Sequence, residues 1–183
     1  MNIIDALKKY VPVNIREEKD REMMLRFLEN EKDCLLRENL AGHITVSPWV
    51  VNKDRTKTLF CYHNIYNSWS WLGGHADGES DLISVAFREA KEETGISPEL
   101  LSEEIFSIEI LPVLGHMKKG EYVPSHIHYN FTFLFEADEH EDTAVNPEEN
   151  SAVKWIALDD IEKMSTEPWM VENIYKKLIE KTK

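Results

Sequence analysis

Three glutamates that share one predicted helical face are the residues of this chain best suited to chemistry. Glu89, Glu92 and Glu93 stand at positions i, i+3 and i+4, so a helix would project their carboxylates from one side within about one turn. Like charges at this spacing repel, and Gly95, read as the residue that ends the helix, places two of them where the helix dipole disfavours anions. The cluster therefore predicts a bound cation, and ligands that are all oxygen atoms select a hard ion, Mg²⁺ or Mn²⁺.

The helix that would carry these carboxylates has a readable beginning and an apolar side. Ser80 is the expected N-cap, and Asp81 would complement the positive end of the helix dipole. The stripe expected to pack on a sheet lies on another side from the glutamates and consists of Leu82, Val85, Ala86 and Ala90. Before the helix, Gly73-Gly74 allows the backbone to pass close to the cluster, where a carbonyl could add a further oxygen ligand.

Stretches rich in β-branched and aromatic residues flank this helix in the sequence and predict a sheet. They are residues 43–52, 56–64, 105–115, 125–138 and 151–158. Pro48 within the first stretch predicts an edge strand or a bulge, because proline cannot donate to a strand ladder. The order of elements favours a layered α/β or α+β sandwich.

Helical spacing of apolar residues marks both ends of the chain. It predicts an amphipathic helix over residues 16–30, a second short segment around Leu35, Leu36 and Leu40, and closing helices over residues 158–164 and 167–181. We therefore divide the chain into an N-terminal helical extension, residues 1–40, and a catalytic domain, residues 41–183. The extension would either cover one edge of the core or contribute to a homodimer.

Composition limits the classes of function. The chain has 183 residues, of which 42% are hydrophobic and 30% charged, which excludes wholesale disorder. A net charge of −13 argues against a surface that tracks a nucleic acid polymer, although metal ions can still bridge carboxylates to a small phosphorylated ligand. No run of eighteen apolar residues predicts a membrane span, and two isolated cysteines, Cys34 and Cys61, fit a reduced cytoplasmic protein.

The segment Gly74–Ile96 resembles the Nudix box, whose pattern is Gly, five residues, Glu, seven residues, then Arg-Glu-aliphatic-any-Glu-Glu-any-Gly-aliphatic. The matching positions are Gly74, Arg88, Glu89, Glu92, Glu93, Gly95 and Ile96, with Ala90 as a small substitute for the aliphatic residue. The first Glu of the box falls on Ser80 instead. Glu79 stands one place early, and we expect it to take the structural role of that Glu, alongside the structural Gly95.

The resemblance implies an α/β/α sandwich around a mixed sheet, and metal-dependent hydrolysis of a nucleoside diphosphate linked to another moiety. It implies that Mg²⁺ or Mn²⁺ would be held by the Gly74 carbonyl and by Glu89, Glu92 and Glu93. Arg88 and Glu92 are then catalytic candidates. Glu149, on a loop outside the box, is the expected general base. Pro112 stands sixteen residues after Ile96, a spacing similar to that of ADP-ribose-cleaving relatives.

One later stretch alternates strictly between polar and apolar residues. His126, His128 and Asn130 share one face of this predicted strand, and we expect them to line a phosphate or base pocket. Two histidines at i and i+2 could also ligate zinc, but no third nitrogen or sulfur ligand stands at a suitable spacing. A solvated face is the remaining interpretation.

Two other functions stay open at this level. An isopentenyl-diphosphate isomerase-like enzyme shares the fold and would need a His-rich metal site and a catalytic cysteine paired with a glutamate. Cys61 is the candidate for that cysteine. A non-catalytic domain that senses a nucleotide would be expected to lose carboxylates of the box, and here only the shifted first Glu departs from the pattern. The intact pair Glu92-Glu93 favours hydrolysis.

Overall fold

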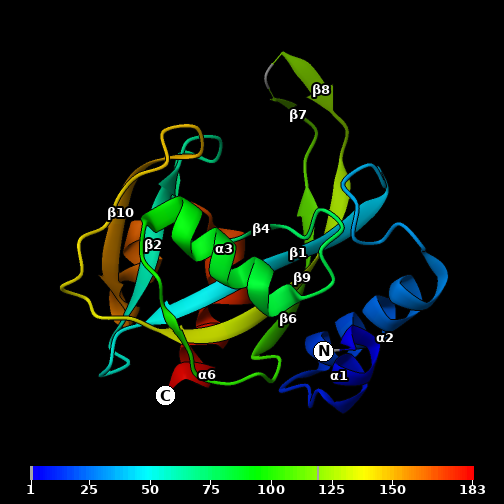
Figure 1. Cartoon of the computed structure of the whole chain (residues 1–183), viewed down its shortest axis with the longest axis horizontal. Helices are drawn as coiled ribbons and strands as arrows, with labels where there is room; N and C mark the ends of the chain where they lie inside the picture. Colours follow the sequence, from blue (N-terminus) through cyan, green and yellow to red (C-terminus); the bar gives the residue numbers. More distant parts are fainter. Residues whose placement is uncertain (1, 119) are drawn as a thin grey trace.

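The computed structural model describes residues 2–118 and 120–183 and folds as a curled mixed sheet with helices on both faces (Figure 1). The helical segments are α1 (Ile3–Lys9), α2 (Ile15–Asn30), α3 (Leu82–Thr94), η1 (Leu158–Asp160), α4 (Ile161–Met164), α5 (Pro168–Met170), the π-helical η2 (Val171–Tyr175) and α6 (Lys176–Thr182). The strands are β1 (Gly42–Val51), β2 (Lys57–His63), β3 (Ser68–Ser70), β4 (Gly74–His75), β5 (Glu99–Leu100), β6 (Ser107–Val113), β7 (His116–Lys118), β8 (Glu121–Val123), β9 (His126–Glu136) and β10 (Asn150–Ala157).

Two long parallel strands, β1 and β9, form the middle of the sheet. Their register runs without a break from the pair Gly42 and Ile127 to the pair Val51 and Glu136. The main path is β10-β2-β1-β9-β5, with β3 on β2, β4 on β1 and β6 on β9, and every pairing other than that of β1 with β9 is antiparallel. The sheet is therefore mixed, as the sequence predicts.

Pro48 does not make β1 an edge strand, so the edge-strand alternative of that prediction is wrong. The proline pairs with Phe133 of β9 in the centre of the sheet. On the other side of β1, pairing with β4 covers Thr45 and Val46, and pairing with β2 is recorded at Val51. Pro48 falls in the interval between these two pairings, where its missing N–H breaks no ladder.

Helices cover both faces of the sheet and bury two apolar clusters. The cartoon shows α3 crossing one face, with the C-terminal helical segments behind the other (Figure 1). Under α3, the apolar stripe of the helix packs against Ile44, Val46 and the phenylalanines of β9. The second cluster joins Trp49 and Phe60 to residues of the C-terminal helices such as Tyr175. This sandwich agrees with the expected fold.

The N-terminal residues form two helices rather than a loose arm. The structure has α2 over Ile15–Asn30, in agreement with the prediction, but the second segment predicted around Leu35, Leu36 and Leu40 is wrong, because residues 31–41 run as turns. Helix α2 packs on β6. Among the described residues, no helix combines the length and the apolar character that crossing a bilayer requires.

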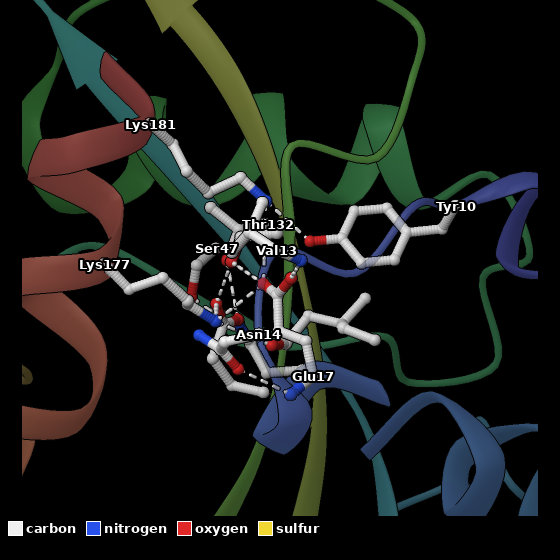
Figure 2. A network of polar contacts seen from close by, with 12 residues as sticks. Tyr10, Val13, Asn14, Glu17, Ser47, Thr132, Lys177 and Lys181 are labelled. Atoms are coloured by element: carbon white, nitrogen blue, oxygen red, sulfur yellow. Dashed lines mark hydrogen bonds and ion pairs between the residues drawn. The ribbon is translucent and has the colours of Figure 1, made fainter. Parts of the chain in front are cut away.

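A buried network of charges joins α2 to the rest of the fold (Figure 2). Glu17 of α2 is fully buried, and its carboxylate lies 3.0 Å from Lys177 Nζ and 3.5 Å from Lys181 Nζ. Lys177 also lies 3.0 Å from the buried Glu109 of β6. Although burial alone would lower the pKa of Lys177, Glu109 and Glu17 raise it above its ordinary value, so the lysine stays charged.

Candidate active site at the carboxylate face of α3

Helix α3 begins one residue later than the sequence predicts. Asp81, not Ser80, is the N-cap residue, and its side chain makes no capping bond to the backbone. Instead the Asp81 carboxylate accepts a hydrogen bond of 2.9 Å from Ser84 Oγ. The C-terminal end follows the prediction, since Gly95 takes the left-handed conformation at φ 77° and its N–H donates to the Lys91 carbonyl. The helix therefore ends at Thr94, one residue after the last glutamate.

Two of the three glutamates are buried and one faces outward. Glu93 is 4% exposed and Glu89 is 6% exposed, whereas the Glu92 side chain is 53% exposed. Burial raises the pKa of Glu89 to about 7, helped by the charges of Glu92 and Glu149 and opposed by Arg88. Burial and the neighbouring Glu89 raise the pKa of Glu93 well above its ordinary range. Both buried carboxyl groups are therefore harder to ionise than an exposed glutamate.

Arg88 lies among the acidic side chains of the segment. Its guanidinium is 2.7 Å from Glu89, 3.6 Å from Glu92 and 3.9 Å from Glu79. It also donates a hydrogen bond of 3.2 Å to the carbonyl oxygen of His75. The structure thus brings Glu79 to the same arginine as the helical glutamates, although it stands one residue early in the pattern.

The Gly73-Gly74 pair brings the backbone against the buried carboxylates. The N–H of Gly73 donates a hydrogen bond of 3.1 Å to Glu93 Oε2. A Cβ atom at Gly74 would overlap the Glu89 carboxylate, so any side chain at that position would occupy the space beside the cluster. The buried carboxylates of Glu89 and Glu93 and the adjacent Gly73-Gly74 backbone place several oxygen atoms close together. This set of oxygen donors fits a hard divalent ion.

The loop before β10 also reaches this cluster. Asn150 is fully buried and donates a hydrogen bond of 2.9 Å from its side chain to the carbonyl oxygen of Glu93 in the last turn of α3. Glu149, the adjacent residue, contributes to the raised pKa of both Glu89 and Glu93 through its negative charge. The residue proposed as general base therefore lies within electrostatic reach of the helical glutamates.

The histidines of β9 lie elsewhere, in a cluster that the sequence does not reveal. His128 pairs with His43 across the parallel ladder, and His75 of β4 pairs with Thr45, two residues along the same face of β1. Nitrogen atoms of His43, His75 and His128 all lie within 4.8 Å of one another, and His126 Nε2 is 3.0 Å from His128 Nε2. The expectation that no third nitrogen ligand joins His126 and His128 is therefore wrong.

Asn130 occupies a different environment from the two histidines with which the sequence groups it. It is 1% exposed, and its side-chain oxygen accepts hydrogen bonds from the hydroxyls of Thr45 and Ser47, at 3.0 and 3.2 Å. Its side-chain nitrogen donates to Glu109 at 2.9 Å. Asn130 thus joins the buried network of Glu109 and Lys177 and is fully hydrogen-bonded within the protein.

Comparison with known proteins agrees with this geometry. Residues 42–181 match the family model described as the NUDIX domain. No curated protein matches the sequence. Among solved structures, a NUDIX-family hydrolase from Clostridium perfringens is 23% identical with a TM-score of 0.50, covering 76% of this chain and 95% of that one.

Two further solved structures share the fold. The MutT protein from Methanosarcina mazei Go1 is 18% identical, with a TM-score of 0.53 and coverage of 78% of this chain and 96% of that one. The C. elegans Ap4A hydrolase is 20% identical, with a TM-score of 0.50 and coverage of 75% and 93%. Together with the match of the NUDIX model to most of the chain, the arrangement of the box residues leads to one conclusion. The chain belongs to the Nudix hydrolase family of pyrophosphohydrolases, which act on nucleoside diphosphate-linked substrates with divalent metal ions.

Proposed function

We propose that the carboxylate face of α3 hydrolyses the diphosphate linkage of a nucleotide such as ADP-ribose, with Mg²⁺ or Mn²⁺ as the ion. The observation that carries the proposal is the pair of buried glutamates, Glu89 and Glu93, pressed against the Gly73-Gly74 backbone. Their raised pKa values support the proposal, because burial disfavours the ionised carboxylates more than the nearby Arg88 favours that of Glu89. A bound cation would supply that charge.

The ligands follow from the donors at this place. Glu89, Glu92, Glu93 and the carbonyl of Gly74 would hold the ion. When bound, the ion neutralises the diphosphate and lowers the pKa of a water molecule. Arg88 would keep the Glu89 carboxylate oriented, because its guanidinium donates directly to that group.

The proton of the attacking water needs an acceptor. Glu149 is exposed and stands on a loop that Asn150 ties to the last turn of α3. Its carboxylate would accept the proton while the water oxygen bonds to phosphorus and the bridging P–O bond breaks, which leaves two phosphate-terminated products. The exposed Glu149 could approach a substrate from solvent, which the buried Glu93 could not.

A substrate panel tests the activity. Purified protein is assayed for cleavage of ADP-ribose, dinucleoside polyphosphates, nucleotide sugars and dNTPs, with Mg²⁺ and with Mn²⁺ in separate reactions. We expect turnover of at least one diphosphate-linked nucleotide and none after chelation of the metal. Absence of cleavage for every substrate of the panel with both ions would instead favour a domain that binds nucleotides without cleaving them.

The variant Glu93→Gln tests the site. Because it removes a proposed ligand while keeping the shape of a buried side chain, we expect turnover to fall at least about a hundredfold with the fold retained. The matched control is Glu103→Gln, an exposed residue after α3, which should leave turnover unchanged. Near-normal activity of Glu93→Gln would overturn the assignment.

The position of Cys61 counts against an isomerase. Cys61 lies in β2 with no exposed surface, and burial raises the pKa of its thiol, assisted by the negative charge of Glu93. A thiol in such surroundings is a poor nucleophile and a poor acid. We expect Cys61→Ala to retain hydrolytic turnover, whereas an isomerase-like enzyme would lose its activity completely without this thiol.

A further inference from the structure

Four imidazole rings come together on the face of the sheet opposite α3. His75 shares its face with Thr45 and His43, whereas the adjacent Gly74 pairs with Val46, whose side chain lies in the core beneath α3. The ring centre of His43 lies 4.9 Å from the ring centres of His75, His126 and His128. Three separate strands, β1, β4 and β9, therefore contribute rings to one point, which is separate from the carboxylate cluster.

The hydrogen bond of His43 shows which of its two ring nitrogen atoms carries the lone pair. The residue is 4% exposed, and its Nδ1 lies 3.1 Å from the carbonyl oxygen of Asn39, so Nδ1 carries the proton and donates it. Nε2 is then an unprotonated acceptor, and it is buried without a hydrogen-bond partner among the described residues. A buried polar atom left without a partner costs free energy, and such atoms are rare in native folds.

A metal ion would satisfy this atom. Histidine ligands of metals typically donate their second ring N–H to a carbonyl, which is the arrangement of His43 and Asn39. Burial, assisted by the charges of His126 and Arg37, lowers the pKa of His43, although the hydrogen bond to Asn39 acts in the opposite direction. Burial and the adjacent histidines lower the pKa of His128 to about 2. Both rings are therefore neutral, the form that binds metals.

We propose that His43, His75 and His128 bind a zinc-class transition metal ion. Their nitrogen atoms lie within 4.8 Å of one another, and tetrahedral Zn²⁺ with bonds of about 2.0–2.1 Å needs them about 3.4 Å apart. Closing the remaining gap takes a shift of about an ångström. Imidazole nitrogen suits Zn²⁺ and its neighbours in the transition series, whereas Mg²⁺ and Mn²⁺ favour the oxygen ligands of α3.

The test measures zinc binding rather than turnover, so it does not depend on the proposed hydrolysis. Zn²⁺ is titrated calorimetrically into metal-free protein in excess Mg²⁺, which blocks the carboxylate ligands but competes poorly for imidazole. We expect about one Zn²⁺ per chain. Substituting Co²⁺ should give the intense visible absorption of a tetrahedral site, which an octahedral carboxylate site would not give.

Three variants and two controls decide the outcome. His43→Asn, His75→Asn and His128→Asn should each weaken Zn²⁺ binding at least about tenfold. The exposed His140→Asn and the active-site Glu93→Gln should bind it as the wild type does. Circular dichroism identifies any variant that fails to fold, and the half-buried His75 gives a milder change than His43. Absence of zinc binding in the wild type, or unchanged affinity in folded variants of all three histidines, would overturn the proposal.

Discussion

At the scale of single residues, the buried glutamates make the metal-free protein sensitive to pH. The pKa of Glu89 rises from 4.5 to about 7, because burial disfavours its charged form. Between these values the folded state binds more protons than the unfolded state. The contribution of Glu89 to stability is therefore fully present below about pH 4.5 and is lost as the pH rises through about 7.

The variant Glu89→Gln isolates this effect. In urea unfolding with a chelator, the wild type should lose on the order of 3 kcal/mol more stability than Glu89→Gln between pH 5 and pH 8. Groups remote from Glu89 titrate alike in both proteins and cancel in the comparison. Glu93 does not cancel, because the charge of Glu89 raises its pKa only in the wild type, and this adds to the difference in the same direction. Saturating Mg²⁺ should remove most of the loss at pH 8, since it stabilises the ionised carboxylate. Equal pH dependence of the two proteins would contradict the prediction.

The sequence predicts the carboxylate cluster of α3 but not the histidine cluster. Arg88, Glu89 and Glu93 stand within one turn of one helix, so their spacing alone places them on a common surface. The histidine cluster follows no such local rule. His43 and His128 are neighbours only through the parallel register of β1 and β9, and a register between distant strands depends on the packing of the whole sheet.

At the scale of elements, the abrupt end of α3 depends on one glycine. Gly95 has φ 77°, and a Cβ atom there would lie 3.1 Å from Ala144 Cβ. An L side chain in the left-handed region costs about 1–2 kcal/mol, so Gly95→Ala should destabilise the protein by at least about that much. The exposed Lys91→Ala in the same helix is the control, with an expected change within about 0.5 kcal/mol. Equal midpoints of urea unfolding for the two variants would refute this account.

The sequence predicts the presence of helices and strands better than it predicts the residues at which they begin and end. The apolar stripe of α3 and the alternation in β9 are repeated signals, and both elements formed. The start of α3 rested on a single residue, and Asp81 took the N-cap position predicted for Ser80. The position of Pro48 in the sheet is not predictable for a related reason, since whether a strand lies at an edge depends on partners contributed from elsewhere in the chain.

At the scale of the whole molecule, the N-terminal helices are part of the folded core. Glu17 of α2 is buried beside Lys177 and Lys181 of α6, at opposite ends of the sequence. A buried charge is tolerated only with partners, so α2 and α6 depend on each other through these side chains. Whether the extension also contributes to a dimer stays a prediction.

Two adjacent lysines of α6 allow a matched test. Lys177→Ala leaves the carboxylates of Glu17 and Glu109 without their shared partner and should cost about 3–5 kcal/mol of unfolding free energy. Lys176→Ala removes only an exposed pair with Glu172 and should cost less than about 1 kcal/mol. Both values come from urea unfolding. Comparable losses in the two variants would show that the buried network does not connect the ends of the chain.

The buried ion network extends beyond the segment of the chain that matches the family model. Its two acidic groups, Glu17 and Glu109, balance its two basic groups, Lys177 and Lys181. The range that matches the NUDIX model, residues 42–181, contains both lysines but only Glu109. A chain reduced to the family domain would therefore lose the Glu17 carboxylate that Lys177 and Lys181 contact. The smallest segment that folds stably is therefore expected to include α2 as well as the family domain.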